Sequence, residues 1–276
     1  IYTLWHTLSL HDALPIYIIP YVDDGAEDWD TALTMLRDAE ADGIVQVVAT
    51  PHVLSDSDLT EEQRYINRFD ELSQRAKDAG IGIKLHLGSE LYIQPYFDFK
   101  RRMATLAENG RYFLVEFPMS MIPGSIEARF FDLFPKEYTS IIAHPERNGT
   151  IISNPSKALY FVDNGAMLQV TAGSLLGVFG SQIKAVAEEL MDRNIVHIIA
   201  TDAHDLNKRT LKLGKAFEFV SKRWGPERAE MLFYENPQKV IAGEDIDIGE
   251  PFEIFDHSFQ HQPSNLLNKV RSLFKR

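Results

Sequence analysis

Six short apolar runs rich in β-branched residues alternate with helical patterns along the chain, and this alternation constrains the fold most. The runs are typical of buried strands and occupy residues 44–50, 83–88, 112–117, 140–143, 167–170 and 196–200. Residues 60–80 and 183–191 have the apolar spacing of amphipathic helices. Strands this apolar need cover on both faces, so the pattern predicts an α/β fold with a parallel sheet inside a shell of helices. We expect the sheet to close into a βα barrel.

Composition excludes several classes of protein. The chain has 276 residues, is 45% hydrophobic, carries a net charge of -12 and contains no cysteine. The negative charge argues against a nucleic-acid partner. The absence of cysteine removes disulfides, thiolate zinc sites and cysteine nucleophiles. We see no apolar run of the roughly 20 residues that span a bilayer and no basic start of a secretion signal, so we expect a cytoplasmic protein.

Histidines and carboxylates follow the predicted strands where each strand ends. In a parallel α/β barrel these carboxyl ends meet at one mouth, so such residues would converge. Glu116 is the most informative, because an unpaired carboxylate in the apolar run YFLVEF would be costly to bury. Carboxylates and imidazoles without sulfur suit manganese, iron or zinc. The imidazoles and carboxylates that would meet at the mouth are Asp23, Asp24, His52, Glu90, Glu116, His144, Asp202 and His204.

Seven motifs occur in a fixed order between residue 22 and about residue 242: VDDGA, TPH, GSE, EFP, AHPERN, QVTAGSLLGVFG and TDAH. Together they resemble the bacterial PHP-domain (polymerase and histidinol phosphatase) tyrosine phosphatases of capsule and exopolysaccharide loci. The resemblance implies a distorted βα barrel with a three-metal cluster, usually of manganese. It also implies hydrolysis of phosphotyrosine on a partner tyrosine kinase.

By position, the resemblance assigns ligands to each metal. The first metal would be held by Asp24, His52 and His204. The second would be held by Glu116 and His144, with Glu90 as a bridge. The third would be held by Glu90, Asp202 and two histidines of an N-terminal Asp-x-His-x-His motif.

That N-terminal motif is missing from this chain. Its positions fall at Ala13, Pro15 and Tyr17, none of which matches it. The run TLSLHDALPI resembles a translated sequencing adapter, so we expect residues 1–17 to be an aberrant segment ahead of a phosphatase domain at 18–248. We also expect the third metal site to be incomplete.

Two arginines follow the predicted ligands and are candidates for binding substrate phosphate. Arg147 lies in HPER and Arg209 in DAHDLNKR, and a guanidinium can bind phosphate oxygens in a bidentate way. A surface role is an equal alternative for Arg209. A metal-bridging hydroxide would attack phosphorus while cations neutralise the phosphoryl oxygens.

Three functions stay open at this stage. The chain could be a phosphotyrosine phosphatase, a catalytically impaired remnant that only binds the partner, or another PHP phosphoesterase such as a histidinol phosphatase. The sequence also leaves open a homo-oligomer.

The tail at residues 249–276 ends in SNLLNKVRSLFKR, which has apolar residues on one helical face and four basic residues. This pattern is typical of a helix that lies on a membrane surface or docks on a partner. A terminal helix that packs on the barrel or frays is the alternative. A membrane contact would bring the protein close to a membrane-bound kinase.

Overall fold

The computed structural model describes residues 11–53, 61–94 and 98–246. The strands of this part are β1 (His11–Ile16), β2 (Ile44–Ala49), β3 (His52–Val53), β4 (Lys84–Leu87), β5 (Glu90–Tyr92), β6 (Tyr112–Glu116), β7 (Thr139–Ala143), β8 (Met167–Thr171) and β9 (Ile198–Ala200). The α-helices are α1 (Trp29–Ala41), α3 (Glu62–Asp78), α4 (Gly124–Glu127), α5 (Gly149–Ser153), α6 (Lys157–Asp163), α7 (Ala172–Leu175), α8 (Ser181–Asp192), α9 (Gly214–Trp224), α10 (Pro226–Glu230) and α11 (Asn236–Ala242). Shorter turns include the 3₁₀ helices η1 (Leu106–Glu108), η2 (Phe130–Asp132) and η3 (Pro145–Arg147), and the π-helical turn η4 (Met231–Glu235).

All strand pairs are parallel, and they form a sheet in the order β1-β2-β4 and a sheet in the order β3-β5-β6-β7-β8-β9. The two sheets are successive parts of one wall, because β3 follows β2 and β5 follows β4 after short breaks. Gly88 N bridges the breaks by donating to Ala49 O at 2.9 Å. On the far side, a bridge between Ile16 and Ala203 joins the end of β1 to the segment after β9. The predicted α/β barrel is confirmed in a distorted form, without one continuous ladder.

The predicted elements agree with the observed ones within about two residues. The six predicted strands are β2, β4, β6, β7, β8 and β9, and the two predicted helices are α3 and α8. Three strands were not predicted: β3 and β5, which are two and three residues long, and β1, which contains Pro15. β1 lies in the segment set apart as aberrant, yet its backbone pairs with β2. The C-terminal tail lies outside the described residues.

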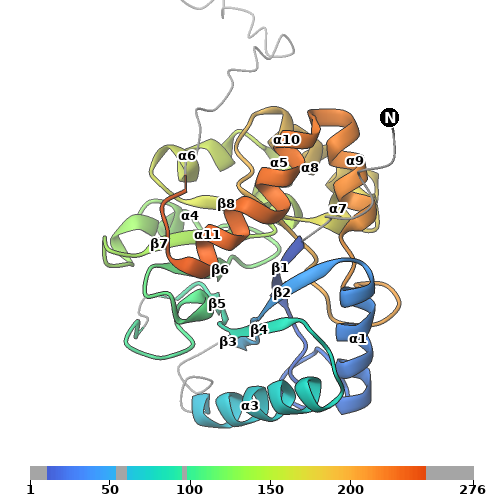
Figure 1. Ribbon diagram of the computed structural model, residues 1–276. Coiled ribbons are helices and arrows are strands. Elements are labelled where there is room, and N and C mark those ends of the chain that lie inside the picture. The colour runs from blue at the N-terminus through green and yellow to red at the C-terminus, as the bar shows by residue number, and fades with distance from the viewer. Residues whose placement is uncertain (1–10, 54–60, 95–97, 247–276) are drawn as a thin grey trace, which may run out of the picture.

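Helices cover the outside of the wall (Figure 1). α1 and α3 lie beside β2 and β4, and the apolar face of α3 buries Phe69, Leu72 and Ala76. α5, α8, α9 and α10 gather on the other side of the molecule (Figure 1). None of the helices in the described part of the chain combines the length and apolar character needed to span a membrane.

Alternate strand residues point to opposite sides of the wall, as the pleat of a strand requires. Residues on the outer side pack into a large apolar cluster under the helices; it includes Val47, Val115, Ile142, Leu168, Val170 and Ile199. Residues between them pack into a smaller inner cluster, which includes Val48, Leu114, Ile141, Ala143, Met167, Ile198 and Ala200. Leu106 of η1 and Val240 of α11 belong to this inner cluster, so these two elements close the amino-terminal end of the barrel.

Candidate metal centre

The strand residues that face the inside of the barrel are apolar along most of each strand and polar at its carboxyl end. Glu116 is two residues beyond Leu114 on β6, and Asp202 is two residues beyond Ala200 at the end of β9. His52 and Glu90 are paired neighbours at the starts of β3 and β5. The period of two therefore aims these side chains into the mouth, opposite the end closed by α11.

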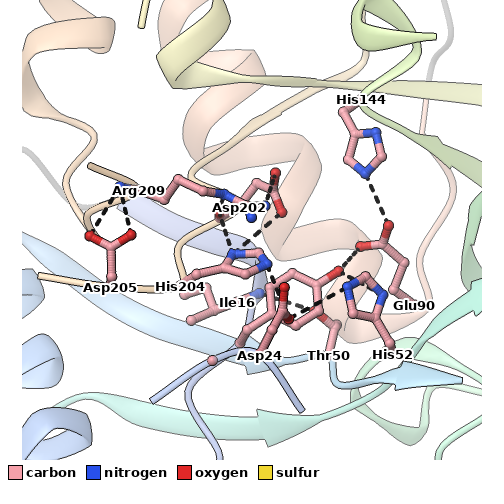
Figure 2. Close-up of polar contacts among 12 residues, drawn as sticks. Ile16, Asp24, Thr50, His52, Glu90, His144, Asp202, His204, Asp205 and Arg209 are labelled. Carbon is pink, nitrogen blue, oxygen red and sulfur yellow. Dashed lines mark hydrogen bonds and ion pairs between the residues drawn. The ribbon is translucent and has the colours of Figure 1, made fainter. Parts of the chain in front are cut away.

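Asp24, His52 and His204 form the first group of possible metal ligands. One donor atom from each lies within 4.8 Å of the others. Asp24 Oδ1 is 3.8 Å from His52 Nε2 and 3.6 Å from His204 Nε2, and Figure 2 shows the two rings directed toward the Asp24 carboxylate. These distances leave room for a cation between the donors. The structure thus brings together the three residues expected to share a metal.

Glu90, Glu116 and His144 form the second group. His144 Nε2 is 3.1 Å from Glu90 Oε1 and 3.5 Å from Glu116 Oε1. His52 Nδ1 also lies 3.9 Å from Glu116 Oε2. Donor atoms of His52, Glu90 and Glu116 lie within 4.8 Å of one another, so His52 stands between the two groups. Glu90 and His144 are buried, and His144 turns into the mouth through a left-handed backbone with φ of 32°.

The ionisation of the second group is controlled by burial and by charge pairing. Burial opposes the charged form of Glu90, but the charge and hydrogen bond of His144, together with His52 and Tyr17, lower the pKa of Glu90 to about 2. Burial likewise disfavours charged His144, but the Glu90 carboxylate raises the pKa of His144 to about 9. Burial and then the charge of Glu90 raise the pKa of Glu116. Protons and cations therefore compete for the same donors.

Asp202 has different partners from those the sequence predicted. Its Oδ2 accepts from the Arg147 guanidinium at 2.6 Å and from the Arg209 guanidinium at 2.7 Å. Its Oδ1 is buried and has no hydrogen-bond partner. Both arginines expected to bind phosphate thus lie at the site, but here they contact this carboxylate. Asp202 also adopts a positive φ of 51°, a conformation that is uncommon outside glycine and is often found at functional sites.

Tyr17 lies in the middle of the centre, and the sequence analysis did not give it a role there. Its hydroxyl donates to Glu90 Oε2 and lies 3.4 Å from His52 Nδ1. Its ring centroid is 4.4 Å from that of His52 and 3.9 Å from that of His204. Burial and the carboxylate of Glu90 raise its pKa well above the usual value. The position in the missing motif was the available signal, because it aligned Tyr17 with a ligand.

Asp23 is a second residue at the site, and the resemblance assigned it no metal. Its carboxylate accepts from His52 N and from Gly25 N, each at 3.1 Å. On the opposite side, His204 donates from Nδ1 to the backbone oxygen of Asp202 at 3.0 Å, which leaves Nε2 facing Asp24. These bonds hold the backbone of one ligand and the ring of another. The doubled aspartate in VDDG was the signal for Asp23.

The donor set fits divalent cations. The centre combines carboxylates and imidazoles at short separations without sulfur, which suits manganese, iron or zinc. The buried Asp202 Oδ1 also lacks a partner, and a cation would satisfy it. Of the third set of ligands, only Glu90 and Asp202 are matched by residues of the required kind.

Comparison with known proteins agrees with the motifs and the geometry. The family described as capsular polysaccharide synthesis, CpsB/CapC, matches residues 14–242. Tyrosine-protein phosphatase YwqE of Bacillus subtilis (strain 168) is 34% identical over 232 residues, which cover 83% of this chain and 91% of that protein. The putative tyrosine-protein phosphatase CapC of Staphylococcus aureus is 33% identical over the same shares of the two chains.

Solved structures give the same relationship. One described with the crystal structures of YwqE from Bacillus subtilis and CpsB from Streptococcus pneumoniae, as unique metal-dependent tyrosine phosphatases, has a TM-score of 0.76 and 32% identity. The superposition covers 88% of this chain and 100% of the solved chain. A phosphotriesterase homology protein from Escherichia coli has a TM-score of 0.53 at 12% identity, covers 84% of this chain and 98% of that chain, and shows the fold alone. The chain therefore belongs to the CpsB/CapC family of capsular polysaccharide synthesis proteins.

Proposed function

We propose that this protein is a metal-dependent phosphatase that hydrolyses phosphotyrosine on a partner protein. One observation carries the proposal: the imidazoles and carboxylates of six separate motifs converge at one mouth, in a chain 32% identical to a solved metal-dependent tyrosine phosphatase. The barrel alone would not support this function, because the same fold carries many activities.

Two cations would be held by the two groups of ligands. One would lie among Asp24, His52 and His204. The other would lie beside Glu90 and Glu116, which His52 and His144 both approach. Manganese is the preferred ion, and iron and zinc are alternatives. When bound, such cations activate a water-derived nucleophile near neutral pH and neutralise charge on phosphoryl oxygens.

The chain's own side chains would bind and orient the phosphoryl group. Arg147 and Arg209 both reach Asp202 at the edge of the centre. A phosphoryl group arriving there would compete with Asp202 for their N–H donors, since guanidinium groups bind phosphate through parallel hydrogen bonds. Asp23 would keep His52 in place, and the Asp202 backbone oxygen would keep His204 Nε2 toward Asp24.

The region of the third cation differs from the family pattern. Tyr17 fills part of it, and the two arginines neutralise Asp202. We therefore propose two bound cations and slow hydrolysis by this chain. The second candidate function is a remnant that binds its partner without turnover. The presence of Tyr17 at a position where the family motif has a histidine favours it.

The partner would be a tyrosine kinase of polysaccharide synthesis in the membrane, and the basic tail would bring the enzyme to that surface. These proposals rest on the resemblance and on the names of the relatives, which are tyrosine-protein phosphatases. A homo-oligomer is compatible with them.

The test is phosphate release after purification in manganese. Phosphotyrosine peptide, histidinol phosphate and p-nitrophenyl phosphate should be compared, with bound metal measured on the same samples. We expect about two metals per chain and a preference for phosphotyrosine peptide. A preference for histidinol phosphate would indicate the other phosphoesterase activity, and metal binding without any turnover would indicate the remnant.

A further inference from the structure

Most of the large apolar side chains that are exposed lie at one end of the molecule. In the part of the chain that the structure describes they are Tyr21, Met119, Met121, Tyr160, Leu176, Val178 and Leu206. All except Tyr160 lie on loops beyond the carboxyl ends of strands, which is the end that carries the metal centre. Apolar side chains exposed together on one face are typical of interaction sites.

Four of these residues lie on two loops, and we name them the mouth rim: Met119 and Met121 after β6, and Leu176 and Val178 after α7. Between 40% and 58% of each residue's surface is exposed. Methionine adapts its shape to varied apolar partners, which suits a surface that receives polypeptide side chains.

Both loops are fastened to the turn that carries Arg147. On one side, Asn148 Nδ2 donates to Pro118 O at 2.8 Å, and Gly149 N donates to Met119 O at 2.9 Å. Gly149 is required there, because a Cβ on it would lie 2.1 Å from the Ser120 carbonyl oxygen.

On the other side, Ser174 Oγ donates to the buried Glu146 Oε1 at 2.6 Å. The Phe179 ring centroid lies 4.6 Å from the guanidinium carbon of Arg147. The mouth rim therefore flanks an arginine at the centre, and its two halves are held in fixed relation to that arginine.

We propose that the mouth rim binds apolar side chains that flank the phosphotyrosine of a polypeptide substrate. The inference rests on the proposed function, because a phosphate bound near Arg147 would place its polypeptide between the two loops. A membrane surface is an alternative occupant that the test distinguishes.

The test compares two double variants. One carries Met119→Ser and Met121→Ser, and the other carries Leu176→Ser and Val178→Ser. Tyr160→Ser is the matched control, because Tyr160 is 39% exposed but lies on α6. The full chain with manganese is assayed on a phosphotyrosine peptide with apolar flanking residues and on p-nitrophenyl phosphate. We expect each double variant to lower kcat/KM for the peptide about tenfold, mainly through KM, and to leave the small ester within about twofold. Equal falls on both substrates, or an unchanged peptide rate, would overturn the proposal.

A binding measurement separates this proposal from the proposed function. Affinity is measured for the same peptide with a non-hydrolysable phosphonate in place of phosphate. If the unaltered chain hydrolyses neither substrate, the phosphatase proposal fails, and a tenfold loss of peptide affinity in the rim variants still supports the mouth rim. No peptide binding by the unaltered chain overturns the mouth rim. The mouth rim is also overturned if the rim variants lose binding to neutral or anionic vesicles while their peptide affinity is unchanged. That result would assign the surface to a membrane.

Discussion

The two groups of ligands in the metal centre are built differently. In the buried half, Glu90, Glu116 and His144 have side-chain exposures of 0%, 13% and 5%, and His144 hydrogen-bonds Glu90 directly at 3.1 Å. In the open half, the Asp24 side chain is 64% exposed and lies 3.6 Å and 3.8 Å from its histidines, beyond good hydrogen-bond range.

This difference indicates how each half keeps its geometry. The buried half has direct charge pairing between side chains shielded from solvent, which holds these side chains in place. The open half relies on supports from outside the group, namely the Asp23 carboxylate and the Asp202 backbone oxygen. We therefore expect the two halves to respond differently to substitution, added ligands and pH.

The largest effect is expected from removing a ligand of the buried half. His144→Ala should lower kcat/KM for phosphotyrosine peptide by about 10³-fold or more, because both the nucleophile and the phosphate clamp depend on that position. Asp24→Ala should have a smaller effect, about 10²-fold, because water can enter an exposed ligand position. Steady-state kinetics with metal analysis checks the pair. A loss from Asp24→Ala equal to or larger than that from His144→Ala would contradict the distinction between the halves.

Restoring the missing motif should produce the next largest change. The triple variant Ala13→Asp, Pro15→His and Tyr17→His would replace the phenol against Glu90 with ligands for a third cation. Bound metal should rise from about two to about three per chain, and turnover by about tenfold to a hundredfold. Elemental analysis and kinetics on one preparation test this. If the triple variant folds, gains a metal and stays as slow as before, the missing ligands do not explain slow turnover.

Support of the open half can be tested at Asp23. Asp23→Ala removes the acceptor for His52 N and Gly25 N, and manganese affinity should fall about tenfold. Asp42→Ala is a matched control, since Asp42 accepts from the backbone of Leu213 and Gly214 at 2.6 Å and 2.9 Å, between α1 and α9. Calorimetric titration should show unchanged affinity in the control. Equal weakening in both variants would mean that Asp23 acts only through general stability.

The last expected effect, about tenfold in manganese affinity for each pH unit, is a pH dependence centred on the Glu90–His144 pair. The raised pKa of His144 gives stability that is complete below pH 6.5 and is lost as pH rises through about 9. The lowered pKa of Glu90 gives stability that is present above pH 4.5 and is lost as pH falls through about 2. In metal-free protein the pair therefore contributes fully between pH 4.5 and 6.5.

A cation at the buried half needs neutral His144, so its binding displaces one proton. Manganese affinity should rise by about tenfold per pH unit between pH 7 and 9. The increase in Tm on adding manganese, measured across that range, reports this dependence. The His144→Ala variant provides the control, because its remaining affinity should lack this rise. A rise of the same slope in that variant would assign the proton to another group.

Much of the barrel and its centre could be predicted from the sequence. Apolar runs separated by helical spacing determine a parallel sheet, because backbone polar groups must be paired and both faces covered. A parallel sheet brings strand ends together, so His52, Glu90, Glu116 and His144 could be expected at one mouth before any distance was known. The short strands β3 and β5 were missed, because two or three residues are too few to show a period.

Tertiary structure alone decided which side chains contact one another at that mouth. Arg147 and Asp202 are 55 residues apart, and their pairing depends on how η3 and the end of β9 meet in space. The placement of Tyr17 against Glu90, 73 residues away, depends on β1 closing the barrel through the bridge to Ala203. The sequence by itself determined the fold and the kinds of ligand, because these follow from local periodicity and strand direction. Charge pairing was decided by the tertiary structure, because electrostatic interaction depends on distance and burial rather than on separation along the chain.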